Sequence, residues 1–598
     1  GLYSSAGIYV GVDNPSTYAR FGAWTQFSTY ATSTWTDQAG NVIDMSTSSS
    51  DITLNASKFV FIEYANAVVA EGYRFKTTGN LTLQSTGASF TSNMNQVNWR
   101  FGRITILGNP KNVQIAKPTD TTNTNWYYDI NATGSIKIYG AYLYFAPNAD
   151  LITTATSGTG VLIQSNNSTL ELNSTNIVQA SGADIQLIGD YVYLGTSGKL
   201  ITTDASGQGI LVKSNNKTLL NGSNTVQTSG ADITFWSDAD NNGVGAMYLD
   251  GGPIIKSAGG KITMAGGLDD GAASSPEITG RTAGDGYPDN YAQGLNGFGA
   301  NDGVDILNSY QILSGGGDIF IAGRGSAVAG DDDYGVLLRG GLMYSDTGKI
   351  AIYAKAPTLC ANNWHRGIAM GWNGDGGVGD YIVSNSTATD AIKLASDMST
   401  CNNGTSVWSS AIQDYYSAGT TIATPNGGGI TLDGKQGSAS FQAGAWGSTN
   451  QESSILELNY VNVLSNSGPI TISGARVSGT GNHSVRFNTR GTTQTNNIGA
   501  STAAISTGFT AYPTINITSS TSDVSITGDS QVLCSAYLRN TGNLVMQPYA
   551  ANFDRAQYFS TDWCAYFPAT YASVRIGKAG TNNFGSNQSS ADVYLDKF

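Results

Sequence analysis

The sequence is poor in charged residues, histidine, proline and cysteine. Only 12% of its 598 residues are Asp, Glu, Lys or Arg, and it holds two histidines, 13 prolines and four cysteines. A disordered chain is usually rich in charge or proline and poor in aromatic residues. This chain has 31 tyrosines, 19 phenylalanines and 10 tryptophans. The composition therefore predicts a folded protein.

Basic clusters, long apolar runs and glutamate are also scarce. The net charge is −13, and Lys and Arg form no cluster that would neutralise a run of phosphates, which argues against nucleic-acid binding. No apolar run reaches about 18 residues, so we expect no membrane span. Only six of the 43 acidic residues are glutamate. Because aspartate favours turns and glutamate favours helices, little helix is expected.

Glycine is abundant, with 75 residues, and the chain contains an internal repeat. Residues 135–187 align with residues 184–235 at a period of about 49 residues. Each copy holds six short runs in which apolar and polar residues alternate, which is the pattern of a half-buried strand. In the second copy these runs begin near Asp184, Tyr191, Lys199, Gly209, Lys217 and Asn224.

The spacing of these runs narrows the choice of fold. Strands that begin about every seven to ten residues leave no room for crossover helices, which excludes a doubly wound α/β sheet. An antiparallel sandwich array and a coil of parallel strands remain. The repeat favours a parallel β-solenoid, in which six strands make two triangular turns of about 24 residues. The Ser-Asn-Asn of 165–167 should then lie two turns from that of 214–216, with the asparagine side chains in ladders.

A shorter unit, a turn followed by an alternating strand, recurs outside this repeat. Glycine supplies the positive φ of the tight turn, and the apolar residues that follow enter the core. Examples are TTGNLTL (77–83), AGGKITM (258–264), GGGDIFI (315–321), DTGKIAI (346–352), NGGGITL (426–432), NSGPITI (466–472), TSDVSIT (521–527) and NTGNLVM (540–546).

These G-[DNK]-I-x-[IL] units resemble the filamentous-haemagglutinin-like β-strand repeats of giant bacterial surface proteins. Longer stretches, such as GADITFWSDADNNGVGAMYLDGG (230–252) and SVRIGKAGTNNFGSNQSSADVYLD (573–596), are similar to repeat regions of very large secreted adhesins of Bacteroidota. Gliding-motility adhesins belong to that class. The resemblance implies an extracellular right-handed β-helix used for display, adhesion or filament building, and it implies no catalytic residues.

We therefore expect an all-β fold. It should be an elongated, right-handed parallel β-helix (β-solenoid) with about three short strands per turn and protruding loops. Residues 1–76 fit the pattern poorly and are expected to form an irregular N-terminal β segment, followed by a continuous solenoid over 77–598. Loop excursions are predicted near 268–310, 360–401 and 534–564.

The four cysteines fall outside the regular repeat, at Cys360, Cys401, Cys534 and Cys564. Four cysteines allow three pairings. We favour Cys360–Cys401 and Cys534–Cys564, because each pair brackets a segment rich in aromatic residues without the repeat pattern. Closing such a loop stabilises a fold by about 3–4 kcal/mol in the chain-entropy description. Buried free thiols are the alternative.

Residues 238–243, Asp-Ala-Asp-Asn-Asn-Gly, match the first half of a calcium-binding loop. The bidentate glutamate of an EF-hand is missing, because Leu249 stands in its place. A solenoid turn can still hold calcium through Asp238, Asp240 and Asn242, which makes calcium the one candidate cofactor. The alternative is a solvated Asx-turn.

Catalytic patterns are weak. The densest carboxylate runs are 269–270 and 331–333, but adjacent residues on a strand point to opposite faces, and hydrolysis needs two carboxylates across a cleft. Neither histidine lies in a nucleophile motif. His365 is expected to be a surface binding or packing residue and His483 to be exposed. We do not expect an enzyme.

Aromatic residues outside the repeat are the stronger functional signal, because flat rings pack on sugar faces and protein partners. The candidate binding residues are Trp364, Trp408, Tyr415, Tyr416 and Trp563. Aromatic plugs at the ends of the solenoid and under its loops are the alternative.

These observations predict a segment of a bacterial cell-surface or filament protein, a rigid stalk that displays binding loops to glycans or to molecules on host or neighbouring cells. Strand edges of an uncapped solenoid invite pairing, so adjacent repeats or other copies of the chain are expected to cover residues near 1 and 598. One alternative is a self-assembling subunit of an extracellular fibre or sheath. A second is a tailspike-like enzyme that degrades polysaccharides.

Overall fold

The structure is a computed structural model. In it the chain forms two compact units, Gly1–Phe235 and Trp236–Phe598. None of the residues it describes is helical. It describes residues 8–11, 19–21, 26–28, 34–36, 42–44, 49, 51–56, 59–61, 73–85, 87–90, 94–95, 104–271, 283–295, 301–326, 333–357, 365–371, 379–401, 409–414, 419–437, 454–477, 483–488, 495–533, 535–550, 553, 557–558, 565–567, 570–578 and 593–594.

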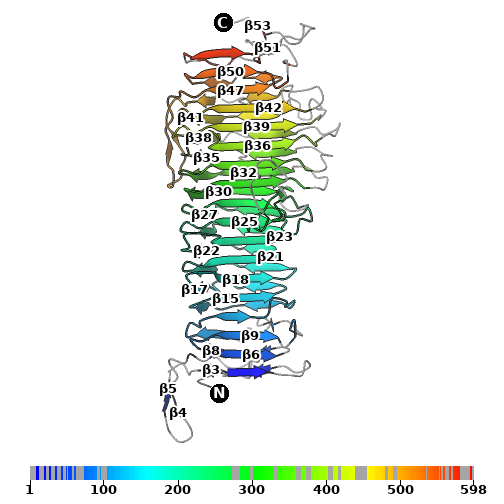
Figure 1. The fold of residues 1–598 in the computed structure, drawn as a ribbon, viewed down its shortest axis with the longest axis vertical. Coiled ribbons are helices and arrows are strands. Elements are labelled where there is room, and N and C mark those ends of the chain that lie inside the picture. Colours follow the sequence, from blue (N-terminus) through cyan, green and yellow to red (C-terminus); the bar gives the residue numbers. More distant parts are fainter. Residues whose placement is uncertain are drawn as a thin grey trace. The chain divides into compact units, whose positions relative to one another are not determined.

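Unit 1 is a parallel β-solenoid whose strands stack in three columns, named A1, B1 and C1 (Figure 1). Column A1 contains β1 (Ile8–Gly11), β6 (Ile52–Ala56), β9 (Leu81–Ser85), β12 (Val113–Ile115), β15 (Ile136–Gly140), β18 (Thr159–Ser165) and the first parts of β21 (Asp184–Leu194) and β23 (Ile210–Asn221). Column B1 contains β10 (Met94–Asn95), β13 (Thr124–Trp126), β16 (Leu143–Phe145), β19 (Thr169–Leu172) and the second parts of β21 and β23. Column C1 contains β14 (Ile130–Ala132), β17 (Leu151–Thr153), β20 (Ile177–Ala180), β22 (Lys199–Thr202) and β24 (Thr225–Gln227).

The register of column A1 shows why the sequence repeats. Ile136 pairs with Val161, Val161 with Ile185 and Ile185 with Ile210, so the longer repeat corresponds to two turns of the solenoid. All four side chains are fully buried. Burying an aliphatic side chain contributes about 1.5–3 kcal/mol, and each turn repeats this contribution in all three columns. The predicted all-β parallel solenoid, with about three short strands per turn, is confirmed.

The boundaries of some strands differ from the prediction. The runs expected near Asp184 and Tyr191 form the single strand β21, and those near Gly209 and Lys217 form β23. The pairing of β21 with β23 shifts register between Gly189 and Tyr191. The corner between columns A1 and B1 is therefore made by an irregularity within an extended strand, and six paired segments per repeat are kept.

The asparagine ladders form only where asparagines lie in adjacent turns. Gly189 pairs with Ser214, and Ser165 lies one turn before it, which confirms that the two Ser-Asn-Asn segments are two turns apart. At that separation the side chain of Asn166 does not pair with the equivalent asparagine of the second segment. Its Nδ2 instead donates to the carbonyl oxygens of Pro118 and Asp120, both at 2.8 Å. In adjacent turns an asparagine rung does form, as where Asn112 Nδ2 donates to Asn80 Oδ1 at 2.8 Å.

The N-terminal region, residues 1–76, contributes strands to the same column. Ile8 pairs with Ile52 and Ile52 with Leu81, all in parallel register, so column A1 runs through the predicted boundary at residue 76. The remaining strands of this region form three smaller sheets. These are parallel β3 (Gln26–Ser28), β8 (Tyr73–Lys76) and β11 (Ile104–Leu107), parallel β2 (Ala19–Phe21) and β7 (Phe59–Phe61), and antiparallel β4 (Thr34–Thr36) and β5 (Val42–Asp44).

Unit 2 is also a parallel β-solenoid with three columns, named A2, B2 and C2, and β25 (Ile233–Ser237) contains the division between the units. Column A2 contains β28 (Ile262–Gly266), β31 (Ile319–Arg324), β33 (Ile350–Lys355), β36 (Ile392–Met398), β39 (Ile430–Gln436), β42 (Ile470–Arg476), β47 (Val524–Gly528), β50 (Asn543–Gln547) and β52 (Ser573–Ile576). Column B2 contains β26 (Ala246–Asp250), the first parts of β30 (Val304–Gly315) and β32 (Tyr334–Ser345), β34 (Arg366–Met370), β37 (Ser410–Asp414), β40 (Leu456–Asn459), β43 (Val485–Asn488) and β48 (Gln531–Val532).

Column C2 contains β27 (Ile254–Lys256), the second parts of β30 and β32, β35 (Tyr381–Ser384), β38 (Thr420–Thr424), β41 (Val461–Ser465), β44 (Asn496–Gly499) and β49 (Ala536–Leu538). Five short strands lie outside the columns: β29 (Ala292–Gln293), which pairs with β31, the antiparallel pair β45 (Ile505–Ser506) and β46 (Thr514–Ile515), and the parallel pair β51 (Gln557–Tyr558) and β53 (Val593–Tyr594).

Glycines at the corner between columns C2 and A2 let successive turns approach closely. A Cβ on Gly317 would lie 2.0 Å from the carbonyl oxygen of Gly260, and a Cβ on Gly348 would lie 2.0 Å from that of Gly317. Positive φ, the role predicted for glycine in this unit, is found at the preceding turn residues Gly259 and Gly315. The motif therefore needs glycine for two reasons, backbone conformation and contact between turns.

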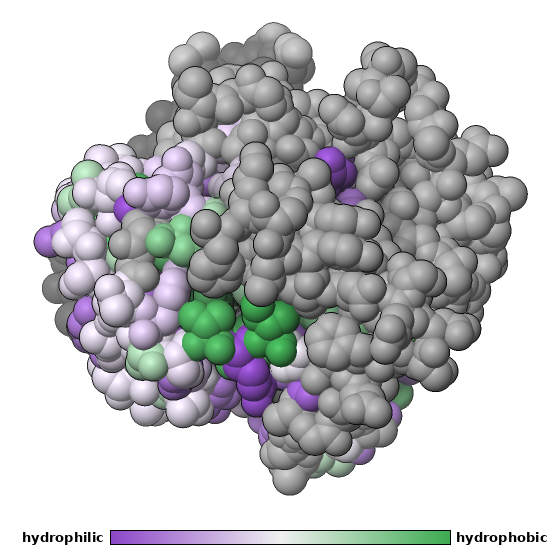
Figure 2. Space-filling view, turned by 90° about the horizontal axis from the view of Figure 1, so that it is seen from above, coloured by the Kyte–Doolittle hydropathy of each residue, from purple (hydrophilic) through white to green (hydrophobic). Residues whose placement is uncertain are grey.

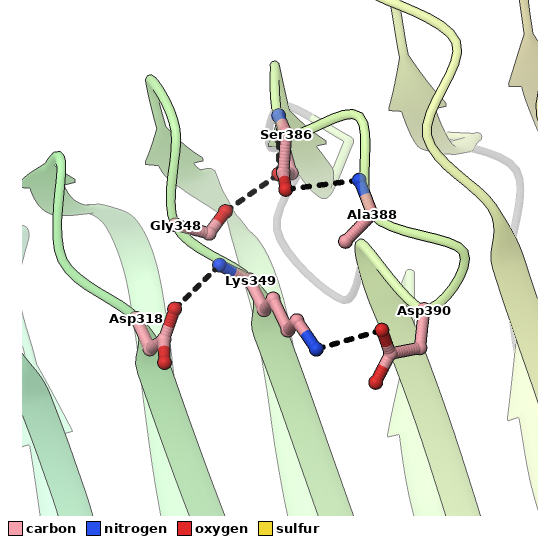
Figure 3. A network of polar contacts seen from close by, with 7 residues as sticks. Asp318, Gly348, Lys349, Ser386, Ala388 and Asp390 are labelled. Carbon is pink, nitrogen blue, oxygen red and sulfur yellow. Dashed lines mark hydrogen bonds and ion pairs between the residues drawn. The ribbon is translucent and has the colours of Figure 1, made fainter.

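Polar side chains link three turns at the same corner (Figure 3). The backbone N–H of Lys349 donates to Asp318 Oδ1 at 2.8 Å, and Lys349 Nζ lies 2.7 Å from Asp390 Oδ1. Ser384 Oγ donates to the carbonyl oxygen of Gly348 at 2.7 Å. The Lys349–Asp390 pair is about half exposed, so it contributes at most about 1 kcal/mol, and the backbone contacts dominate.

Residues 500–523, named the strap, run along the outer side of column C2. Ile515 and Ile517 of the strap pack against Val383, Ala423 and Leu464, which belong to three successive turns. The Tyr344 and Tyr512 rings lie 4.6 Å apart between centroids, and Tyr381 Oη donates to the carbonyl oxygen of Ser506 at 3.1 Å. The strap therefore ties turns together from outside.

Replacing Gly348 with alanine should destabilise unit 2 by about 1–3 kcal/mol, because the added Cβ meets a backbone oxygen that cannot move without shifting a whole turn. The measurement is the midpoint of guanidinium unfolding followed by circular dichroism. Gly87→Ala is the matched control, since its Cβ would meet nothing closer than 3.7 Å and its φ is not left-handed. Equal effects of the two substitutions would contradict this account of the corner.

Candidate functional site

The connections from column A2 to column B2 leave successive turns at the same corner. Four of them, residues 325–333, 356–365, 399–409 and 437–455, follow one another in successive turns. Trp364 and Trp408 lie in two of them. Arg366 pairs with Ser410 in parallel register. Each tryptophan stands two residues before one of these paired residues. We name this corner the loop corner.

The five predicted binding residues, Trp364, Trp408, Tyr415, Tyr416 and Trp563, lie outside the described residues. Their role in binding stays a prediction. Their sequence positions relative to the columns are nevertheless defined by strands on either side. Trp364 and Trp408 precede β34 and β37, and Tyr415 and Tyr416 directly follow β37.

A row of buried polar side chains lies beside the loop corner, on successive strands of column B2. Arg366 Nη1 donates to Tyr334 Oη at 2.9 Å, and its guanidinium lies 5.3 Å from the centre of the Tyr334 ring. Arg366 Nε donates to Gln413 Oε1, and Gln413 Nε2 donates to Glu457 Oε2 at 2.7 Å. All four side chains are 2–5% exposed. The row spans four turns and balances one positive with one negative charge.

The row links the strands that border the loop corner. A buried charge without a partner costs several kcal/mol, and the hydrogen bonds through Gln413 offset part of that cost for Arg366 and Glu457. Removing one member would take a hydrogen bond from a buried neighbour. The row therefore favours one arrangement of the strands from which the loops start.

Two aspartates at the start of β30 form a buried carboxyl pair. Asp302 is 2% and Asp305 3% exposed, and their carboxyl groups interact electrostatically. Asp302 Oδ1 also accepts the backbone N–H of Tyr334 at 2.6 Å. Burial raises the pKa of Asp302 well above its ordinary value, and the charges of Asp305 and Asp333 add to this. Burial likewise raises the pKa of Asp305 to about 6.

Both histidines are buried, which corrects the prediction that His365 lies on the surface and His483 is exposed. His365 Nδ1 lies 3.2 Å from Asp333 Oδ2, and both side chains are fully buried. His483 is 7% exposed, and its Nδ1 lies 3.2 Å from Ser530 Oγ. Each histidine lies directly ahead of a column B2 strand, where the chain enters the packed interior. The sequence pattern missed this because turn residues surround both histidines.

Asp269 and Asp333, which belong to the two carboxylate runs singled out in the sequence, contact other groups of the protein. Asp331 and Asp332 lie outside the described residues, and Asp333 is fully buried. Asp269 accepts backbone N–H groups, with Oδ1 2.7 Å from the nitrogen of Gly284 and Oδ2 2.8 Å from that of Gly286. Asp269 therefore anchors a loop.

The predicted calcium residues lie in an Asx-turn, the alternative considered for them. Asp238 Oδ1 accepts the N–H of Gly243 at 3.1 Å, and Asn242 Oδ1 accepts that of Val244 at 2.9 Å. Asn242 Nδ2 donates to Asp240 Oδ2 at 2.9 Å. Burial raises the pKa of Asp238 to about 6.

Calcium binding by this turn stays a prediction. Its oxygens are engaged by neighbouring N–H groups, which lowers their availability as ligands. Within the part of the chain that the structure describes, no three His, Cys, Asp or Glu side chains converge to hold a metal ion.

Cys401 takes part in a disulfide and is 1% exposed. It follows β36 closely and lies in the connection 399–409 of the loop corner. Cys360, Cys534 and Cys564 lie outside the described residues. The pairing Cys360–Cys401 therefore stays a prediction, as does Cys534–Cys564.

Sequence reasoning did not single out the buried polar row or the Asp302–Asp305 pair. Arg366, Gln413 and Glu457 lie 47 and 44 residues apart along the chain, in turns of unequal length, so no fixed period links them. The only usable signal in the sequence is the pattern within each strand. Alternation within each strand marks the residues that point outward, but it does not tell which of them a loop covers.

The chain matches no protein-family model, no curated protein and no solved structure. In the described part of the chain, no helix is long and apolar enough to cross a membrane.

Peptide mapping without reductant should recover Cys360 linked to Cys401. The reason is that both cysteines belong to neighbouring connections of the loop corner, residues 356–365 and 399–409. A reduced and alkylated sample serves as the control. Recovery of Cys401 linked to Cys534 or Cys564, or alkylation of all four thiols without reductant, would refute the pairing.

The stability of unit 2 should fall as the pH rises from about 4 to about 6. The folded Asp302–Asp305 pair keeps protons that an unfolded aspartate has released in this window, so the folded state binds more protons and loses stability as they leave. Asp305→Asn should reduce this fall by an amount on the order of 2 kcal/mol.

Thermal unfolding at pH 4, 5, 6 and 7 measures the effect. Asp250, Asp333 and Arg339 face the pair and are left unchanged. Asp390→Asn, at an exposed carboxylate, is the control and should leave the pH dependence as it is. A pH profile of Asp305→Asn that coincides with the wild-type profile is the contradicting result.

Proposed function

We propose that this chain is an adhesive segment of an extracellular bacterial surface or filament protein, in which the solenoids are a rigid scaffold for binding loops. The loop corner is the observation that carries the proposal. Four long connections leave successive turns at the same corner, while the strands between them keep strict parallel register. A scaffold that holds its strands constant and varies its loops is suited to display.

The interior supports a mechanical role. Each turn packs its buried aliphatic residues on those of the next turn, and the strap fastens column C2 from outside. The Arg366–Gln413–Glu457 row fastens column B2 beside the loop corner. A binding loop held by such a scaffold loses less conformational entropy when it binds.

The buried acids favour adhesion over hydrolysis. Glycoside hydrolysis needs two carboxyl groups that reach the sugar from both sides. Asp302, Asp305 and Asp333 are 0–3% exposed, and Asp302 Oδ1 accepts the backbone N–H of Tyr334 at 2.6 Å. In this arrangement they hold strands together.

The surface favours polar partners. In the end-on view of Figure 2 the described surface is mostly pale or purple, and strongly hydrophobic residues take up a small part of it. Exposed large hydrophobic residues among those described are dispersed along the chain: Tyr191, Leu268, Val477, Tyr549, Tyr566 and Val574. A surface of this kind suits glycans better than an apolar protein face or a lipid bilayer.

Trp364→Ala combined with Trp408→Ala should weaken attachment of the purified chain to glycan-coated or cell surfaces by about tenfold or more, since aromatic anchors dominate most binding sites. The assay is retention on a glycan array and on whole cells. Tyr566→Ala, at a residue 55% exposed that pairs with Tyr537 of column C2, is the control. Circular dichroism checks that each variant is folded.

Three results would overturn the proposal. If the tryptophan variant attaches as strongly as the wild-type chain, the loop corner has no role in attachment. Cleavage of a glycan in the array would instead support the polysaccharide-degrading enzyme. Head-to-tail polymers in electron micrographs, without attachment to any surface, would support a structural subunit of a fibre or sheath.

A further inference from the structure

Four tyrosines form two pairs on the outer side of column B1. Tyr144 aligns with Glu171 in the next turn, and Glu171 aligns with Tyr193 in the turn after that. Tyr142 and Tyr191 lie two residues before Tyr144 and Tyr193. They occupy the neighbouring outward row, in which Thr169 lies between them. Each pair is a Tyr-x-Tyr segment whose middle residue is buried. We name these four residues the tyrosine face.

The spacing of the tyrosine face follows from strand geometry. Two residues along a strand are about 6.6 Å apart, and two turns of the stack are about 10 Å apart. The pairs are separated by one turn that carries Thr169 and Glu171. Rings in adjacent turns would lie about 4.8 Å apart and pack on each other. Rings two turns apart cannot. The Tyr144 ring contacts the Tyr127 ring, 6.1 Å away between centroids, and the remaining exposed ring surface of the four tyrosines faces solvent.

The tyrosines are accessible yet held in place. Tyr191 is 39% exposed, and Tyr142, Tyr144 and Tyr193 are partly exposed. Tyr142 Oη donates to Glu171 Oε2 at 2.6 Å. Asn173 Nδ2 donates to Tyr144 Oη at 3.0 Å. Rings fixed by hydrogen bonds at their hydroxyl groups lose little freedom when a ligand packs on them.

Polar groups of both kinds surround the rings. Glu171 offers carboxylate oxygens and Asn173 an amide beside the first pair. Lys217 aligns with Tyr191 in the following turn. Asp190 directly precedes Tyr191, so Glu171 and Asp190 outweigh the single positive charge of Lys217, and the face does not attract an acidic polymer. Its hydroxyl-binding groups complement an uncharged, hydroxyl-rich chain.

We propose that the tyrosine face binds a neutral, extended β-linked polysaccharide that runs along the stacking direction of unit 1. Sugar rings lie on the two tyrosine pairs, and Glu171 and Asn173 bind sugar hydroxyl groups between them. The two-turn period of about 10 Å is close to the length of a disaccharide unit in such a chain. This inference rests on the proposed adhesive function and assigns it a ligand class and a site separate from the loop corner.

The probe is a β-1,4-linked glucose hexasaccharide, titrated into the full chain by calorimetry. Tyr144→Ala combined with Tyr193→Ala should weaken binding by about tenfold or more, because one ring is lost from each pair. Tyr144→Phe with Tyr193→Phe keeps the rings and should bind within a few-fold of wild type, which separates ring contact from misfolding. The control Tyr549→Ala removes a tyrosine elsewhere and should change nothing.

Length and charge dependence sharpen the test. The corresponding disaccharide reaches one pair and should bind at least about tenfold more weakly than the hexasaccharide. A galacturonic acid hexasaccharide tests a charged chain and should bind more weakly too. No binding of the neutral hexasaccharide, equal binding by the alanine variant, or preference for the charged chain would each overturn the inference.

The outcomes separate this inference from the proposed function. If the chain attaches to surfaces through Trp364 and Trp408 while the tyrosine variants change nothing, the tyrosine face is not a site and the adhesive function stands. If the hexasaccharide binds through the tyrosines while the chain attaches to no glycan-coated or cell surface, the site stands and the adhesive function falls.

Discussion

In-register pairing of short parallel strands is the constraint on which both units depend. Each strand hydrogen-bonds to the equivalent strand of the next turn, so a residue that faces inward does so in every turn. The core is therefore a set of aliphatic columns, such as Ile350, Ile392, Ile430 and Ile470, all fully buried. The same constraint requires glycine where turns touch, as at Gly317 and Gly348, because a backbone oxygen occupies the place of a Cβ.

Parallel register also organises the outer surface. Outward residues of successive turns form rows, and a row can be aliphatic, polar or aromatic without disturbing the core. In unit 2 Gln413 and Glu457 are in register and buried beside the loop corner, and Arg366, which pairs with Ser410, reaches Gln413 by a hydrogen bond. In unit 1 another row contains Tyr144, Glu171 and Tyr193 and remains partly exposed. Function in such a fold therefore depends on which rows are covered.

Local sequence pattern was sufficient for the fold but insufficient for the burial of polar groups. The alternation around Ile185 and Leu187 and the long internal repeat predicted strands, their parallel stacking and the length of a turn. His365 and His483 were predicted at the surface because turn residues surround them. Their burial depends on neighbouring turns, as Asp333 packs on His365 and Ser530 on His483. These contacts join residues far apart in the sequence, beyond the reach of a local pattern.

The sequence by itself determined that the chain is all-β, that its strands stack in parallel and that two turns make one internal repeat, because a period in the sequence becomes a period in space when each turn lies on the last. The tertiary structure decided which outward residues meet. Connections of different length separate Asp302, Arg366 and Glu457 along the chain. Parallel pairing nevertheless stacks the strands that carry or follow them in one column. It also turned the two Tyr-x-Tyr segments of the repeat into one face, since only stacking brings Tyr144 and Tyr193 to a distance of about 10 Å.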